Sequence, residues 1–367
     1  MKFKWLYIYY LVCILTKGLA YSYATTKIIL LSEINIFLIL LLSLVVEFIV
    51  FIEVSYLKII SNASIKSISF GGSFLLLLLI IVEFNNDVVH LIVHFTFITF
   101  LFSNLLLKLE SNILNTSNNY KMGLTNITVL NNLSKLLGFS MGAIFYNLSI
   151  EAFALFIIFI LLFSSLFKIP NKNLKEKENE VFELDYIKKN KLADKQYLLI
   201  LALLGSITVY WIPVFVDVLE KENLLRYSFI IFLLPGIFSI SFLSIIKKKP
   251  QFLLKKYDLY FYFVFLLVFF VSFYFNFIFL SFFLINLIFI LSISISIDIR
   301  AVFLKLNSHA DKKYLLQLFK VTPSFMIFAF TLLSFSTKHT PEITLGLNAL
   351  AVLIYSVKKE KAHEHEY

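Results

Sequence analysis

The sequence predicts an all-α polytopic membrane protein with about twelve transmembrane helices in two six-helix bundles. Of its 367 residues, 60% are hydrophobic and 15% are charged, whereas ordinary soluble domains carry about a quarter charged residues. The apolar residues form long blocks, for example 36–52 and 153–167. A helix of about 20 apolar residues matches the hydrocarbon thickness of a bilayer and satisfies its own backbone polar groups there.

The apolar blocks place the spans in order along the chain. We expect them at residues 5–23, 35–57, 67–84, 88–107, 125–146, 149–167, 197–218, 227–246, 258–275, 277–297, 314–336 and 342–357. The apolar stretch 259–296 is too long for one span, so a helical hairpin is expected near Phe275 and Asn276. Asn147 separates the fifth span from the sixth, and Lys320 and Pro323 interrupt the eleventh. Because Lys17 lies within the first apolar stretch, a cleaved signal peptide is not the favoured interpretation.

The distribution of basic residues predicts the orientation. With the N-terminus in the cytoplasm and alternating spans, 26 of the 33 Lys and Arg residues fall on the cytoplasmic side and 5 fall outside. Cytoplasmic loops of membrane proteins carry such an excess. The bias predicts a multi-pass protein of the inner (cytoplasmic) membrane with both termini in the cytoplasm, and it explains the net charge of +10 without a nucleic-acid partner.

A Lys- and Glu-rich stretch divides the chain. It covers residues 169–196 and separates an N-terminal six-helix bundle, 1–168, from a C-terminal one, 197–367. Two six-helix halves joined by a cytoplasmic loop are a plan of secondary transporters, whose substrate site lies at mid-membrane between the halves.

Enzymatic classes find no support in the sequence. It contains no phosphate-binding glycine loop, nucleophile elbow or zinc-peptidase motif, and its single cysteine, Cys13, excludes a disulfide framework. We therefore expect no catalytic residues, cofactor or structural metal.

Residues 53–72 carry a specific resemblance. After the second span the sequence has Glu53, Ser61 and Lys66, followed by Gly71 and Gly72. This stretch resembles the loop between the second and third helices of the major facilitator superfamily, in which a Glu, an acidic–basic motif and a later Gly occupy these places. The resemblance implies gating roles for Glu53, Ser61, Lys66 and Gly72. Ser61 replaces the family's Asp, so much of its charge relay is missing here.

A second likeness lies in the fifth span. Gly138 and Gly142 resemble the glycines of the fifth helix of facilitator exporters, although Ala143 stands where proton-coupled antiporters have Pro. The resemblance implies alternating-access transport by a monomer, and efflux as its direction. The GxxxG spacing itself indicates close helix packing.

Ionisable residues within the spans are candidates for proton coupling, because such groups are costly in the bilayer. Glu47 lies near the middle of the second span, where a carboxylate can carry a proton or form a structural ion pair. His90 and His94, four residues apart on the fourth span, share a helix face with Asp87. These three can form a proton relay or provide only interfacial polarity; a metal site would need a further ligand.

Five residues are candidates for lining a substrate cavity. They are Lys17, Lys135, Tyr210, Trp211 and Asn286. The lysines can attract an anion, the aromatic side chains can stack on a substrate, and the amide can donate a hydrogen bond. Each also has a structural alternative, namely snorkelling, interfacial anchoring or helix–helix bonding.

The sequence thus favours a secondary transporter that moves a small molecule, with proton-coupled efflux as the preferred direction. Two alternatives remain open at this point: a lipid-linked glycan flippase or polymerase, and a degenerate facilitator that does not transport.

Overall fold

Every regular element that the structure describes is a helix, which confirms the predicted all-α class. The structure is a computed structural model, and it describes residues 2–31, 37–117, 120–145, 147–165, 196–206, 211, 237–238, 240–242, 256–275, 277–307, 310–336 and 340–364. Three of the described helical segments, Asp87–Thr116, Ile278–Leu306 and Lys312–Leu333, are long and apolar enough to cross a membrane. They support a helical membrane protein, and the expected total of twelve spans stays a prediction.

The helices follow the apolar blocks. They are α1 (Lys2–Leu31), α2 (Phe37–Ile52), the π-helix η1 (Glu53–Leu57), α3 (Ile59–Asn62), α4 (Ile65–Ile81), α5 (Asp87–Thr116), α6 (Tyr120–Phe145), α7 (Ile150–Ser165), α11 (Lys256–Tyr274), α12 (Ile278–Leu306), α13 (Lys312–Ser336) and α14 (Thr340–Glu364). Residues 196–206 are also helical. The expected eighth span and the central loop lie essentially outside the described residues.

Both predicted hairpin breaks are present. Helix α6 ends at Phe145 and α7 begins at Ile150, while α11 ends at Tyr274 and α12 begins at Ile278. Pro323, in contrast, lies inside the continuous helix α13. A proline inside a helix removes one backbone donor. Pro323 packs against Gly205 of the helix 196–206, where an added Cβ would lie 2.7 Å from the Cγ of the proline.

The chain divides into two compact units. Unit 1 comprises the described residues of 1–118, 133–189 and 308–321, and unit 2 those of 119–132, 190–307 and 322–367. The division falls inside α6 and α13, so each of these helices contributes to both units.

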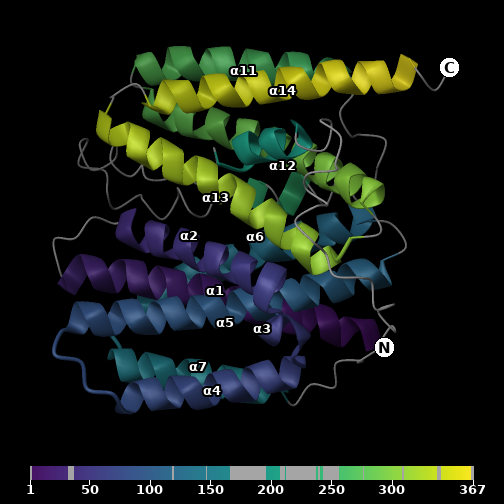
Figure 1. The fold of residues 1–367 in the computed structure, drawn as a ribbon. Helices are drawn as coiled ribbons and strands as arrows, with labels where there is room; N and C mark the ends of the chain where they lie inside the picture. Colours follow the sequence, from purple (N-terminus) through teal and green to yellow (C-terminus); the bar gives the residue numbers. More distant parts are fainter. Residues whose placement is uncertain are drawn as a thin grey trace. The chain divides into compact units, whose positions relative to one another are not determined.

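Unit 1 is built around α5. Helix α1 runs along α5, α2 and α4 pack against it, and α4 lies beside α7 (Figure 1). Large apolar side chains remain exposed on α4 and α7, including Phe74, Ile81, Phe159 and Phe163. An apolar surface of this kind fits contact with lipid better than contact with water.

A close approach of α1 and α6 depends on Gly138. A Cβ at this position would lie 2.7 Å from the backbone oxygen of Leu15 and 3.0 Å from the backbone nitrogen of Leu19. Backbone atoms cannot move aside as a side chain can, so Gly138→Ala is expected to lower the thermal unfolding midpoint of the protein in detergent. Gly71→Ala is the matched control, because nothing lies within 4 Å of a Cβ there and alanine favours helix. Equal stability of the two variants would contradict the close approach.

A buried amide links several helices of unit 2. Asn348 of α14 is fully buried and accepts hydrogen bonds from Tyr262 of α11 and Ser292 of α12, and its amide donates to the backbone oxygen of Leu203. One side chain thus joins three helices to α14. Elsewhere in unit 2, Lys121 of α6 forms a 2.5 Å ion pair with Asp298 of α12.

Candidate functional site

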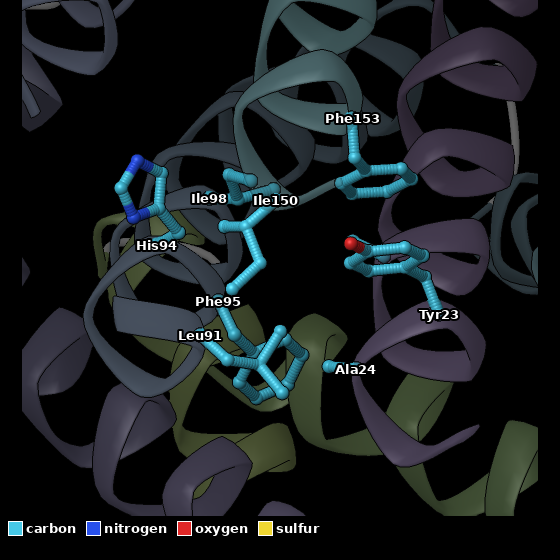
Figure 2. A pocket seen from close by; sticks show the side chains of 9 residues that line it. Tyr23, Ala24, Leu91, His94, Phe95, Ile98, Ile150 and Phe153 are labelled. Carbon is cyan, nitrogen blue, oxygen red and sulfur yellow. The ribbon is translucent and has the colours of Figure 1, made fainter. Parts of the chain in front are cut away.

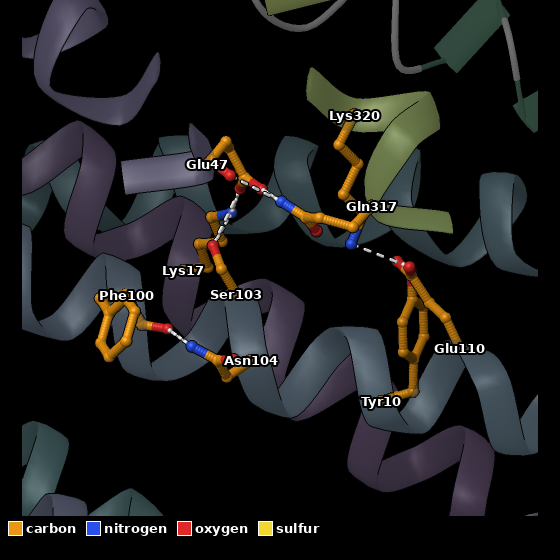
Figure 3. A network of polar contacts seen from close by, with 9 residues as sticks. All are labelled: Tyr10, Lys17, Glu47, Phe100, Ser103, Asn104, Glu110, Gln317 and Lys320. Carbon is orange, nitrogen blue, oxygen red and sulfur yellow. Dashed lines mark hydrogen bonds and ion pairs between the residues drawn. The ribbon is translucent and has the colours of Figure 1, made fainter. Parts of the chain in front are cut away.

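A cluster of polar side chains from four of the described helices centres on Glu47 of α2 (Figure 3). The ammonium nitrogen of Lys17, on α1, lies 2.6 Å from the Glu47 carboxylate and donates 2.7 Å to the hydroxyl of Ser103 on α5. That hydroxyl in turn donates 2.8 Å to the same carboxylate oxygen. Three helices therefore share one charged, hydrogen-bonded group, as expected of an ionisable residue within a bilayer.

Gln317 brings α13 to the same carboxylate. Its amide nitrogen donates 3.0 Å to the second carboxylate oxygen of Glu47 and 2.8 Å to the Glu47 backbone oxygen. Gln317 is fully buried, and its own oxygen has no hydrogen-bond partner among the described residues. The Gln317 amide nitrogen thus donates to Glu47, while the amide oxygen accepts no hydrogen bond from the described residues, which is unusual for a buried polar atom.

A second acid–base pair follows on the same helices. Lys320 of α13 lies 2.8 Å from the carboxylate of Glu110 on α5, and the buried hydroxyl of Tyr10 on α1 donates to that carboxylate at 3.1 Å. Figure 3 shows this pair next to the Glu47 group, with Gln317 and Lys320 extending from the same stretch of α13. The two pairs contain two acidic and two basic residues, so the cluster is charge-balanced.

Helical spacing explains why these side chains meet. Tyr10 and Lys17 are seven residues apart on α1, as are Ser103 and Glu110 on α5. Residues at this spacing, two turns apart, lie on the same face of a helix. Gln317 and Lys320, three residues apart, likewise share a face of α13. Three helices therefore present aligned polar stripes to one another. We call these six residues together with Glu47 the charged stripe.

The N-terminal turns of α13, which precede Gln317, make further polar contacts. Lys312 donates to the side chain of Asn115 at the end of α5, and Lys313 donates 3.2 Å to the backbone oxygen of Ser61. The Tyr314 ring lies 5.8 Å from that of Phe51, centroid to centroid. The first ten residues of α13, Lys312 to Val321, thus contact α2, α3 and α5 within unit 1.

The residues that resembled a gating loop are partly brought together. Glu53 is buried, and one of its carboxylate oxygens accepts hydrogen bonds from the backbone nitrogens of Ile60, at 2.6 Å, and Ser61, at 2.9 Å. It therefore fixes the turn between α2 and α4, in which Lys58 adopts a left-handed conformation with φ 54°. This is a positioning role through the backbone.

The other two loop candidates lie apart from this contact. Lys66 is exposed at the start of α4. Gly72 is buried against α5, where an added Cβ would meet the side chain of Leu101 at 2.4 Å. Gly72 therefore serves the packing of α4 on α5.

The histidine candidates form a separate group near the start of α5. His90 and His94 are buried, their rings meet edge to face at 4.4 Å, and the Nδ1 of His94 lies 3.0 Å from the His90 backbone oxygen. The acidic neighbour is Glu151 of α7, 3.5 Å from His90 Nδ1, whereas Asp87 is exposed in the first turn. The structure therefore places Glu151 beside His90, in the position that the sequence suggested for Asp87.

His94 also lines a small apolar pocket between α1, α5 and α7 (Figure 2). Tyr23 and Phe153 stack at 3.9 Å on its far wall. No group of three or more His, Cys, Asp or Glu side chains within the described residues is placed to hold a metal.

The expected cavity residues have different fates. Lys17 joins the charged stripe. Trp211 is buried in unit 2, where its ring nitrogen donates 3.2 Å to Thr344 and its ring packs edge-on against Phe269. Asn286 is fully buried and donates to the Phe282 backbone oxygen, while no described residue donates to its own oxygen. Tyr210 and the side chain of Lys135 lie outside the described residues.

Sequence reasoning missed four members of the stripe: Tyr10, Ser103, Glu110 and Gln317. Glu110 was not among the candidates because the expected span ended at residue 107, whereas α5 continues to Thr116. Lys320 was noted only as an interruption of a span. The spacing of Gln317 and Lys320 on an otherwise apolar helix was the available signal.

No protein-family model matches the sequence, and no curated protein matches it. The chemistry of the charged stripe is therefore the basis on which a function can be assigned.

Proposed function

We propose that this protein is a secondary transporter that moves a small molecule across the cytoplasmic membrane and couples that movement to protons through Glu47. The observation that carries the proposal is the charged stripe, in which a buried carboxylate on α2 is bonded to α1, α5 and α13. A group of this kind inside a membrane protein is retained for function by default, because apolar side chains would hold helices together at lower cost.

Protonation of Glu47 supplies a coupling step. The carboxylate accepts from Lys17, Ser103 and Gln317, and a protonated carboxyl accepts less strongly and cannot form an ion pair. A proton on Glu47 would therefore loosen the hold of α13 on α2. Because the adjacent turns of α13 also bind α5 and the loop after α2, the proposed conformational change is a release of this segment. Alternation between its bound and released states would give alternating access.

The remaining assignments belong to the same proposal. The expected bundles, 1–168 and 197–367, would move against each other around the central loop, with both termini in the cytoplasm and the chain acting as a monomer. The partners are the lipid bilayer, a small-molecule substrate and protons, with no nucleic acid. Efflux remains the direction implied by the resemblance to facilitators.

The test is a measurement of proton movement in proteoliposomes. Under an imposed pH gradient, the wild-type protein is expected to accelerate the dissipation of that gradient when its substrate pool is supplied as a total metabolite extract. Glu47→Gln keeps the hydrogen-bonding shape but holds no exchangeable proton, so it is expected to lower the coupled proton flux at least about tenfold, as when a positioned proton-transfer group is lost.

The matched control is Glu83→Gln, because Glu83 is exposed in the loop between α4 and α5. It is expected to leave the flux unchanged. An active Glu47→Gln variant with full coupling would remove Glu47 from the mechanism, and a wild-type protein that moves neither protons nor metabolites would refute transport.

A further inference from the structure

The two ion pairs of the charged stripe are asymmetric in their exposure. In the first, the side chain of Lys17 is 26% exposed and that of Glu47 is 13% exposed. In the second, the values are 28% for Lys320 and 6% for Glu110. In both pairs the lysine side chain is more exposed than the side chain of the acid. A ligand that approaches this cluster therefore meets the lysine side chains before the carboxylates.

The two ammonium groups belong to one polar cluster. Lys17 of α1 binds Glu47 and Lys320 of α13 binds Glu110, while Gln317, three residues before Lys320, donates to the same Glu47 carboxylate. The Lys17 nitrogen is anchored there by contacts of 2.6 and 2.7 Å to Glu47 and Ser103. Two cations held near one point by opposing helices form a receptor for negative charge.

From this arrangement we infer that the substrate is a small organic anion with one or two carboxylates, recognised by Lys17 and Lys320. The inference rests on the proposed transport function and names its substrate class. The anion takes over the ammonium groups from Glu47 and Glu110. Tyr10, Ser103 and Gln317 provide neutral donors at the same place, so a carboxylate that enters there can also be hydrogen-bonded.

Proton uptake follows from this exchange. Among the described residues, Glu47 contacts the charged Lys17 from α1, the neutral Ser103 from α5 and the neutral Gln317 from α13, with Lys320 one turn further along α13. When the anion occupies the lysines, Glu47 loses the charges that stabilise its ionised form and takes a proton from solution. Anion and proton then bind together, and by linkage each strengthens the binding of the other. This linkage produces co-transport of the anion and the proton in the same direction, and it takes the place of the proton-driven efflux that the resemblance to facilitators implies.

The test uses binding, so that it does not depend on transport. Purified protein in detergent is titrated with succinate, and its unfolding midpoint is followed together with the pH of a weakly buffered solution near neutrality. Succinate is expected to raise the midpoint, since a ligand of the folded state stabilises it, and to cause proton uptake. Succinamide, the uncharged analogue, and putrescine, a dication of the same carbon number, are expected to do neither.

A charge swap gives the sharpest variant. Lys17→Glu combined with Glu47→Lys preserves the ion pair but places the carboxylate on the more exposed site. Gln317 can accommodate the swap, because its oxygen, which has no partner within the described part of the chain, becomes an acceptor for the new ammonium when the amide rotates. The swapped protein is expected to lose the succinate effect and to gain stabilisation by putrescine.

The outcomes separate the two levels of the proposal. Stabilisation by succinate without any transport in proteoliposomes would support the anion site and refute the proposed function. Transport without any effect of succinate, an equal effect of succinamide, or a succinate effect that survives the charge swap would overturn the anion site. Proton release on addition of succinate would overturn co-binding.

Discussion

Replacing Lys320 with methionine is expected to destabilise the protein by about 3 kcal/mol and to reduce sharply the amount of folded protein recovered from membranes. Methionine retains the length of the side chain but removes the charge. Glu110, whose side chain is only 6% exposed, then keeps a single neutral donor, the hydroxyl of Tyr10. Removing one partner of a buried ion pair is costly because the other charge remains in a poorly solvated place.

A second substitution shows whether the orphaned charge is the cause. Lys320→Met combined with Glu110→Gln removes both charges and leaves an amide that still accepts from Tyr10. This double variant is expected to recover most of the lost stability, as judged by the unfolding midpoint in detergent. If the double variant were as unstable as Lys320→Met alone, the loss would come from packing of α13, and the ion pair would not be its source.

The helical class could be predicted from the sequence because it depends on a coarse property, the length of the apolar blocks. The breaks at residues 146–149 and 275–277 were predictable for the same reason, since polar or small residues interrupt the apolar run there. Helix ends were harder. Helices α5 and α12 continue past residues 107 and 297, because hydropathy marks the edge of the bilayer while the backbone can remain helical in water.

Only part of the charged stripe could be predicted from the sequence, for a different reason. Lys17 and Glu47 attract attention singly, as ionisable residues in apolar stretches, but nothing in one sequence says that they face each other. Their pairing depends on the rotation of α1 and α2 around α5, and that rotation is set by packing across hundreds of residues. Gln317 is neutral and lies 270 residues from Glu47, so its spacing from Lys320 could indicate a polar face of α13 but could not identify Glu47 as its partner.

The second large effect is expected in unit 2, where Asn348→Leu should lower the free energy of unfolding by about 2 kcal/mol. Leucine has a similar volume, so the change removes polar contacts without opening a cavity. The hydroxyl of Tyr262, which is fully buried, loses its acceptor on Asn348, and Ser292 loses a weaker one at 3.4 Å. An unsatisfied buried donor costs more than the hydrogen bond itself contributed.

Tyr262→Phe in the Asn348→Leu background tests this explanation, because it deletes the hydroxyl that the first substitution leaves unpaired. Unfolding midpoints of the wild type, both single variants and the double variant form a cycle that isolates the interaction between the two side chains. The second substitution is expected to be close to neutral in the variant background, although it is destabilising in the wild type. Additive losses would mean that Asn348 stabilises α14 through Leu203 and the backbone, independently of α11. Asn348 would then join α14 to the helix 196–206 and, more weakly, to Ser292 of α12, and α11 would keep its aromatic packing against Trp211 without depending on Asn348.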